Sequence, residues 1–198
     1  MNPATPEEKK RLRAKIRARL SRLDPSRRRE ASTRLCHALL EMPEFLAARK
    51  VLGFCPLPAE PDVQPALRYL RTLGAVICLP RWNPATSEYL PAVVISEDEL
   101  VPGPFEVPEP PPTTPLVPWA ELDLVLVPGL AFDPMGRRLG RGRGYFDRIL
   151  SRAPQARRWG LAFGVQVVDV VPAEPHDIHM HVLVTPERTW SVSSEVSS

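Results

Sequence analysis

Residues 122–152 predict a strand, a glycine-rich loop and a helix in direct succession. An apolar run ends at Val127, glycines alternate with arginines over residues 138–144, and a helical pattern begins at Tyr145. Glycine has no Cβ, so backbone N–H groups in such a loop can approach phosphate oxygens closely. The positive end of the helix dipole and the arginines add favourable charge. The stretch therefore predicts a site for a polyphosphate.

The glycine spacing by itself is a less specific signal. It matches neither G-x-x-x-x-G-K-[ST] nor G-x-G-x-x-G, the two common nucleotide motifs. Glycines mark turns more often than phosphates, so an ordinary loop is an equal alternative on this pattern alone. The flanking strand and helix, with Asp147 on the first turn of that helix, favour the phosphate site.

Short apolar runs alternate with helical patterns along much of the chain. This alternation predicts an α/β fold with a mainly parallel sheet in a three-layer α/β/α sandwich, preceded by an N-terminal pair of helices. Ligands of such folds bind at the carboxyl ends of the strands, where the glycine loop begins. We expect one domain over residues 1–190 and a disordered tail over 191–198. The expected helices span residues 6–23, 26–41, 63–73 and 145–152, and the expected strands span 50–57, 75–80, 90–95, 122–127, 158–163 and 178–184.

The N-terminal helices are strongly basic. Residues 1–34 carry 12 Lys or Arg and 4 Asp or Glu, whereas the whole chain has a net charge of +3. On a helical wheel Lys9 lies within the apolar arc and Arg13 at its edge, while Arg11 and Arg22 face water. A basic helix can bind nucleic acid, but no aromatic side chains for base stacking lie among these arginines. We therefore expect no nucleic-acid partner.

The composition predicts a soluble cytoplasmic protein, which we expect to act as a monomer. No apolar run approaches the roughly 20 residues that span a membrane, and we find no secretory signal at the N-terminus. The cysteines Cys36, Cys55 and Cys78 are odd in number and widely spaced, as expected of free thiols in a reducing compartment. Eight of the 25 prolines lie over residues 102–118 and predict an extended surface connector.

The stretch from Pro128 to Asp147 resembles the signature of the 5-formyltetrahydrofolate cyclo-ligase family, also called methenyltetrahydrofolate synthetases. The signature reads Pro-Gly-x-x-Phe-Asp-x-x-Gly-x-Arg-Leu-Gly-x-Gly-x-Gly-Tyr-[Tyr/Phe]-Asp, and every fixed position is present. Further similar segments are a Lys-x-x-x-Arg pair on the first helix and the strand end at residues 54–62.

The resemblance implies an enzyme that uses ATP to close 5-formyltetrahydrofolate to 5,10-methenyltetrahydrofolate, with release of ADP and phosphate. It implies a folate as substrate, ATP as co-substrate and Mg²⁺ as the metal. The implied ATP-binding residues are Lys9, Arg13, Arg138, Leu139, Gly140, Arg141, Gly142, Arg143, Gly144, Tyr145 and Phe146. The implied substrate-binding residues are Cys55, Glu60, Tyr89 and Tyr145. The implied metal ligands are Asp147 and Asp177.

Several acids in these segments have a structural alternative. Glu60 could be an acid at the start of a helix, and Asp147 could complement a helix dipole. The sequence Asp-Pro-Met-Gly at Asp133 indicates a turn rather than a further metal ligand. Glu109 lies in the proline-rich connector, where no catalytic role is expected, and is left out of the predicted site.

The histidines near the C-terminus suggest a second kind of metal site. On a strand, Asp177, His179 and His181 would share one face as a two-His-one-carboxylate set, with His176 close by. Nothing else in the sequence indicates a transition metal, so we expect ordinary histidines here.

Three departures from the family pattern keep a non-catalytic paralogue open as an alternative. Tyr89 stands where Met is frequent, Glu106 where Gly is usual, and His181 where an acid is common.

Overall fold

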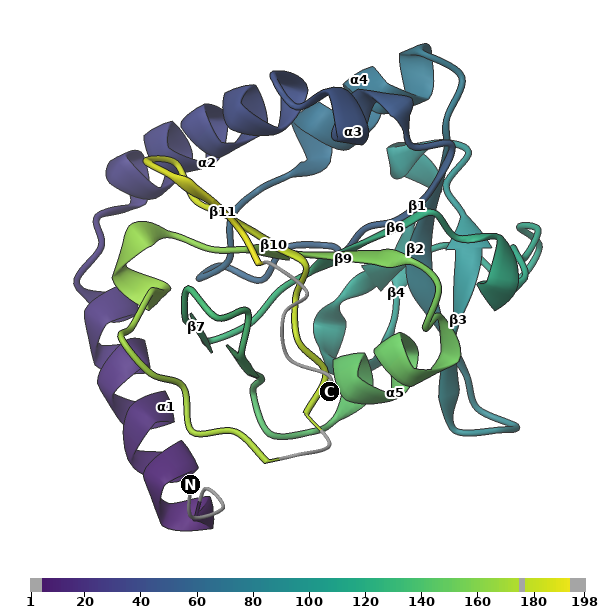
Figure 1. Cartoon of the computed structure of the whole chain (residues 1–198). Coiled ribbons are helices and arrows are strands. Elements are labelled where there is room, and N and C mark those ends of the chain that lie inside the picture. The colour runs from purple at the N-terminus through teal and green to yellow at the C-terminus, as the bar shows by residue number, and fades with distance from the viewer. Residues whose placement is uncertain (1–4, 175–176, 193–198) are drawn as a thin grey trace.

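The computed structural model describes residues 5–174 and 177–192. In this part of the chain, seven strands form a central sheet (Figure 1). In spatial order they are β11 (Thr189–Ser191), β10 (Val182–Val184), β9 (Arg157–Leu161), β6 (Leu124–Val127), β1 (Lys50–Leu52), β2 (Val76–Asn83) and β3 (Glu88–Val93). Strands β10, β9, β6, β1 and β2 are parallel, and the edge strands β11 and β3 are antiparallel to their neighbours. The predicted α/β fold with a mainly parallel sheet is confirmed.

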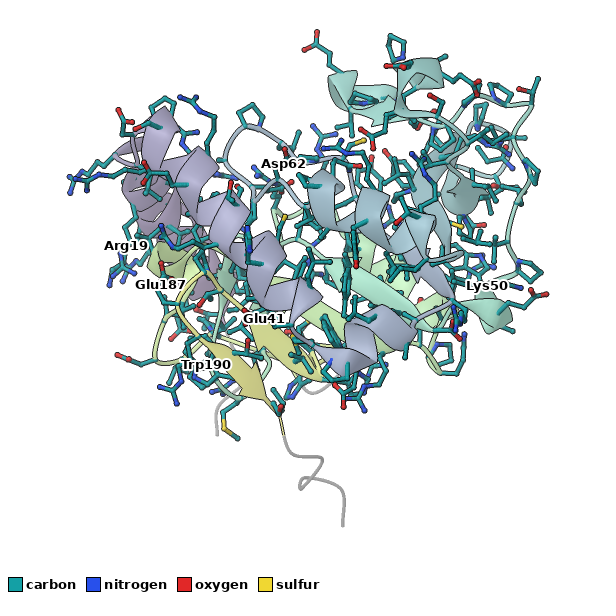
Figure 2. The ribbon with its side chains drawn as sticks, turned by 90° about the horizontal axis from the view of Figure 1, so that it is seen from above. Arg19, Glu41, Lys50, Asp62, Glu187 and Trp190 are labelled. Carbon is teal, nitrogen blue, oxygen red and sulfur yellow. The ribbon has the colours of Figure 1, made fainter. Side chains whose placement is uncertain are left out.

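Helices cover both faces of the sheet. In Figure 1, α2 (Pro25–Leu40), α3 (Pro43–Ala47) and α4 (Gln64–Thr72) lie on one face, and α5 (Tyr145–Arg152) lies on the other. Neighbouring strand residues divide between the two layers, as the pleat requires: Val51 packs with the α2 and α4 side chains, whereas Leu52 packs with the α5 side chains. Figure 2 looks onto the α2 and α4 layer from above, with Asp62 labelled just before α4.

The first two helices begin where the sequence provides caps. At α1 (Pro6–Ser21) the Thr5 side chain accepts from Glu8 N, and the Glu8 carboxylate accepts from Thr5 N in return. At α2 the Asp24 carboxylate accepts from Ser26 N at 2.7 Å. Each helix also starts with proline, whose missing N–H is not needed in the first turn. These caps place the apolar stripe of α1 against the loop after β6.

The strand β1 is shorter than predicted. It ends at Leu52 rather than at residue 57, because Pro56 and Pro58 follow in the chain and proline cannot donate to a ladder. Residues 54–60 consequently form a loop at the carboxyl end of β1. Strand β2 continues to Asn83, past its predicted end at residue 80, and therefore includes Trp82.

The C-terminal part also differs from expectation. β10 begins at Val182 rather than at residue 178, and the unpredicted strand β11 includes Ser191. Strand β11 thus extends one residue past the expected domain boundary at 190, and Val192 N donates to His181 O at 2.8 Å. Residues 193–198 of the expected tail lie outside the described residues.

Two small hairpins complete the fold near the ends of the strands. One pairs β7 (Ala131–Phe132) with β8 (Arg138–Leu139), and the other pairs β4 (Val101–Pro102) with β5 (Pro108–Glu109) around the 3₁₀ turn η2 (Pro104–Glu106). The proline-rich segment is therefore more than an extended connector. The other 3₁₀ turns are η1 (Glu97–Glu99), η3 (Trp119–Glu121) and η4 (Gly164–Gln166).

Candidate functional site

A cavity of about 250 Å³ lies at the carboxyl ends of the parallel strands, where ligands bind in open α/β sheets. Its walls come from the loop after β1, the β5 hairpin, the loop after β6 and the start of α5. The residues that line it include Phe54, Cys55, Leu57, Glu60, Tyr89, Glu109, Pro128, Arg138, Gly140, Arg141, Arg143, Gly144, Tyr145, Phe146 and Asp147. Most of the residues predicted for the nucleotide and the substrate thus share one cavity.

The backbone of the glycine loop adopts conformations that favour glycine. Gly142 and Gly144 have φ values of 105° and 67°, in the left-handed region that favours glycine. Gly144 is the N-cap residue of α5, and no side chain of the described residues caps that helix. Uncapped N–H groups at a helix start, beside a glycine loop, form an anion site.

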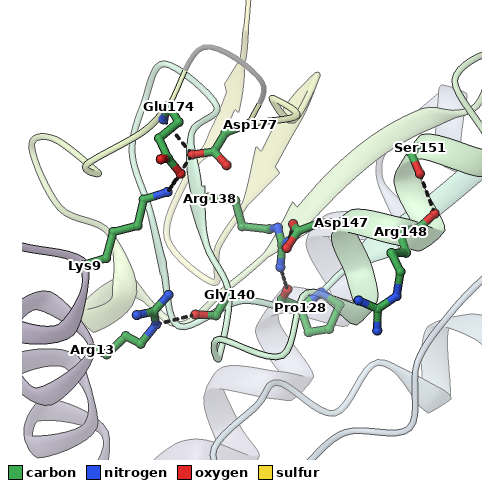
Figure 3. Close-up of polar contacts among 10 residues, drawn as sticks. All are labelled: Lys9, Arg13, Pro128, Arg138, Gly140, Asp147, Arg148, Ser151, Glu174 and Asp177. Atoms are coloured by element: carbon green, nitrogen blue, oxygen red, sulfur yellow. Dashed lines mark hydrogen bonds and ion pairs between the residues drawn. The ribbon is translucent and has the colours of Figure 1, made fainter. Parts of the chain in front are cut away.

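The helix α1 brings one cation, Arg13, to this loop and a second, Lys9, to the segment that precedes β10. Arg13 Nε donates to Gly140 O at 3.0 Å, and Lys9 Nζ lies 2.8 Å from Glu174 Oε2 and 3.0 Å from Asp177 Oδ2 (Figure 3). Burial acts to lower the pKa of Lys9, but the two carboxylates outweigh it and leave the pKa above its usual value. Arg11 and Arg22 are exposed.

A third cation, Arg138, lies beside the predicted metal ligand Asp147 (Figure 3). Its side chain is 6% exposed, forms an ion pair with Asp147 and donates to Pro128 O at 3.2 Å. Burial lowers the pKa of Arg138, while Asp147 and Asp177 act to raise it; a guanidinium stays charged in either case. Asp147 and Asp177 are thus each paired with a cation in the ligand-free protein.

The predicted substrate residue Glu60 joins the loop after β1 to the glycine loop. Its side chain is 5% exposed, and its two oxygens accept from Arg141 Nε at 2.9 Å and from Leu57 N at 3.0 Å. Glu60 is therefore not a simple helix-start acid, since it contacts a residue predicted for ATP. Burial raises the pKa of the neighbouring Cys55 thiol to about 11, so Cys55 is a neutral wall residue rather than a nucleophile.

Three aromatic side chains cluster at the cavity. The ring centroids of Trp82 and Tyr89 are 5.1 Å apart, those of Tyr89 and Tyr145 are 5.2 Å apart, and those of Trp82 and Tyr145 are 6.0 Å apart. The antiparallel register places Trp82 opposite Tyr89. Sequence reasoning predicted the two tyrosines and missed Trp82, because the pairing of β2 with β3 was not known.

The two described histidines of this segment, His179 and His181, both contact Arg158. Asp177 contacts Lys9, whereas His181 Nδ1 accepts from Arg158 N at 3.0 Å and His179 O accepts from Arg158 Nε. Within the described ranges, no group of three or more His, Cys, Asp or Glu side chains is arranged to hold a metal ion. His176 lies outside the described residues.

Two residues that the sequence analysis did not predict contact residues of the site. Glu174 contacts Lys9 from a loop without periodic pattern. Gln166 is fully buried, donates to Gly129 O at 2.7 Å and accepts from Phe163 N, which fixes the start of the loop after β6. In the sequence Gln166 follows a strand pattern and was interpreted as packing.

Asp133 has the structural role that its sequence indicates. It is fully buried and accepts from Met135 N, Arg137 N, Arg137 Nε and Val171 N. The carboxylate is therefore occupied by four donors inside the β7–β8 turn and has no place in the cavity.

Comparison with known proteins identifies the relatives of this chain. A family model described as 5-formyltetrahydrofolate cyclo-ligase family matches residues 5–186. The 5-formyltetrahydrofolate cyclo-ligase of Mycolicibacterium smegmatis is 37% identical over 153 residues, covering 72% of this chain and 76% of the relative. The Escherichia coli K12 protein of the same name is 30% identical over 179 residues, covering 88% of this chain and 98% of the relative.

A solved structure agrees with these relatives. The structure of Aquifex aeolicus 5,10-methenyltetrahydrofolate synthetase superimposes with a TM-score of 0.84 at 32% identity, covering 96% of this chain and 95% of that one. Separately, none of the helices described here is both long and apolar enough to cross a membrane.

Proposed function

Because this chain belongs to the 5-formyltetrahydrofolate cyclo-ligase family, we propose that it catalyses the ATP-dependent cyclisation of 5-formyltetrahydrofolate to 5,10-methenyltetrahydrofolate, with release of ADP and phosphate. The observation that carries this proposal is the shared cavity. Its lining combines a glycine loop and an uncapped helix start with aromatic and apolar side chains. A triphosphate and a flat ring system fit these two parts.

The chemistry explains why the two substrates need adjacent sites. The nitrogen lone pair of an N-formyl group is delocalised into the carbonyl, so the carbon is a poor electrophile and its oxygen a poor leaving group. Transfer of the γ-phosphoryl group to the formyl oxygen creates an imidate phosphate. Attack by N10 then forms the methenyl bridge and phosphate departs. The protein's task is to position the groups and neutralise charge, as in other phosphoryl transfers.

Particular residues supply that positioning. The backbone of residues 138–146 holds the phosphates, and Lys9, Arg13 and Arg138 add positive charge around the loop. Cys55, Glu60, Tyr89 and Tyr145 form the folate side of the cavity. No side chain needs to act as a covalent nucleophile, in agreement with the raised pKa of Cys55.

Asp147 and Asp177 are the residues that would hold Mg²⁺ with the ATP phosphates. Carboxylates are hard oxygen donors, and Mg²⁺ typically binds through one or two of them together with phosphate oxygens and water. The Arg138 guanidinium is paired with Asp147, and the charge of Asp177 also acts on its pKa, which supports placing both acids around one phosphate site. Bound there, the metal would neutralise charge on the phosphates.

Absorbance of the methenyl product tests the proposal directly. Purified protein is mixed with 5-formyltetrahydrofolate, with ATP and Mg²⁺ both present or with either one omitted. Product formation only in the complete mixture supports the proposal. Binding of ATP and folate without product would identify a non-catalytic paralogue instead, and binding of neither would overturn the assignment. The cavity is complete within one chain, so we also propose that the monomer is active, which sedimentation under assay conditions checks.

A further inference from the structure

The three carboxylates that line the cavity differ in their partners. Glu60 is paired with Arg141 and Asp147 with Arg138. Among the residues that the structure describes, the third carboxylate, Glu109, has no ion-pair partner. Arg81 is near enough to influence it, but the Arg81 guanidinium donates to the carbonyl oxygens of residues 111, 112 and 114.

Contacts on two sides fix the Glu109 carboxylate. Its Oε2 accepts from Trp82 N at 3.0 Å, which ties β5 to the neighbouring strand β2. Gly103 packs against the same group: a Cβ there would lie 2.6 Å from the Glu109 carboxyl carbon. A side chain at Gly103 would therefore displace the carboxylate. The fold holds Glu109 at the cavity wall in a defined position.

The second oxygen, Oε1, has no hydrogen-bond partner within the described part of the chain. Burial raises the pKa of Glu109, and the N–H of Trp82 and the charge of Arg81 only partly oppose this. Oε1 of this partly buried carboxylate is therefore able to accept a hydrogen bond from a ligand donor. A ligand that fits this position carries N–H groups on the edge that faces Glu109.

The surrounding side chains indicate the shape of that ligand. Tyr89 lines the same cavity, and Glu109 is close enough to raise its pKa, after the larger effect of burial. Tyr89 contacts the rings of Trp82 and Tyr145 edge to face. Aromatic walls next to a carboxylate suit a flat ring with N–H donors on its edge. The pyrimidine ring of a pterin has this chemistry, with a ring N–H beside an exocyclic amino group.

We infer that Glu109 recognises the amino-substituted pyrimidine edge of the folate pterin and thereby determines substrate specificity. This inference rests on the proposed function, because it takes a folate as the ligand. It gives Glu109 a role distinct from that of Glu60, whose oxygens both already accept hydrogen bonds from the protein. The proline-rich segment then serves to present this one carboxylate.

The first test compares Glu109→Gln with Glu106→Gln. Glu106 is exposed, lies three residues away in the same hairpin and is outside the cavity. Affinities for 5-formyltetrahydrofolate and for ATP are measured separately by calorimetry. We expect Glu109→Gln to weaken folate binding about 10-fold or more, as for loss of a charge-assisted hydrogen bond. ATP affinity, and both affinities of Glu106→Gln, should change less than about 2-fold.

The second test needs no mutation. A 5-formyltetrahydrofolate analogue that lacks the 2-amino group should bind the wild-type protein about 10-fold or more weakly, and Glu109→Gln should discriminate less between the two ligands. Equal binding of analogue and substrate by the wild type, or unchanged folate affinity in folded Glu109→Gln, would overturn the inference while leaving the enzymatic function in place. A wild-type protein that binds no folate would overturn both.

Discussion

The Lys9 ammonium lies 3.0 Å from a carboxylate oxygen of Asp177, at the junction of α1 with the loop that precedes β10. The Arg138 guanidinium forms an equivalent pair with Asp147. Cations proposed for the phosphates are thus paired with the acids proposed for the metal. Binding of a magnesium–nucleotide complex would exchange these partners without leaving any of the four charges unpaired.

Replacement of Lys9 and Arg13 by Ala should weaken ATP binding about 10-fold or more, because Arg13 contacts the glycine loop and Lys9 contacts the proposed metal ligand Asp177. The matched variant replaces Arg11 and Arg22, which are exposed on the same helix, and should change ATP affinity less than about 2-fold. Calorimetric titration of both variants with ATP makes the comparison. Equal losses would mean that the helix acts through diffuse charge.

Gly144→Val should remove measurable ATP binding while the protein remains folded. The φ of 67° is strained for any residue with a Cβ, and a Cβ would lie 3.3 Å from Arg148 Nη1 at the helix start. Gly74→Val is the control, because Gly74 also has positive φ but no atom lies within 4 Å of its Cβ position. In both variants the free energy of unfolding should decrease by about 1–2 kcal/mol. Only Gly144→Val should lose ATP binding. ATP affinity is measured by calorimetry. An unchanged affinity in Gly144→Val would mean that the phosphates bind elsewhere.

Asp147→Asn should lower turnover in a way that high Mg²⁺ partly restores, since the amide keeps the size of the side chain but is a poorer metal ligand. The measurement is turnover against Mg²⁺ concentration. Asp147 could instead act through its ion pair with Arg138. A loss of turnover that no Mg²⁺ concentration relieves would show that Asp147 acts by holding that guanidinium.

Asp133→Asn should destabilise the protein by about 2–3 kcal/mol, because an amide cannot satisfy four donors that converge on one buried carboxylate. Asp169→Asn, at an exposed position, serves as the control and should stay within about 0.5 kcal/mol of wild type. Urea unfolding of the two variants measures the difference. Near-wild-type stability of Asp133→Asn would contradict the role given to these hydrogen bonds.

Stability should decrease between pH 6.5 and 4 through His181. Burial, with the charges of Arg158 and Arg157, lowers the pKa of His181 from 6.5 to about 4. The unfolded chain therefore takes up a proton in this range while the folded ring stays neutral, so acid favours unfolding. Because the ring is partly solvated, we expect an effect of about 1–2 kcal/mol. His181→Gln should reduce this loss, whereas His37→Gln, at an exposed site, should leave it unchanged in unfolding curves at both pH values.

Sequence patterns predicted a site residue correctly where the helix or loop that carries the residue also determines its position. The apolar stripe of α1 faces Leu130 and Leu139, and that packing determines the direction of Lys9 and Arg13. The glycine spacing likewise determines the backbone of its own loop. The helix α5 agrees with its prediction at both ends.

Other contacts depend on how distant segments meet. Trp82 reaches the aromatic cluster through the register of β2 with β3, and Glu174 reaches Lys9 from an irregular loop. Glu109 is oriented by a backbone N–H of another strand. None of these relationships leaves a periodic signal in the sequence. The length of β1 was overestimated for a related reason, since apolar residues continue past the point where the prolines end the ladder.

The contact between Lys9 and Asp177 joins residues 168 positions apart. During synthesis, the helix that carries Lys9 leaves the ribosome long before the loop that completes its environment. A nascent or prematurely terminated chain that lacks Asp177 therefore presents a basic α1 without its acidic partners. This pair of charges forms only once residue 177 has been synthesised, so products truncated before that residue should compete poorly for a magnesium–nucleotide complex.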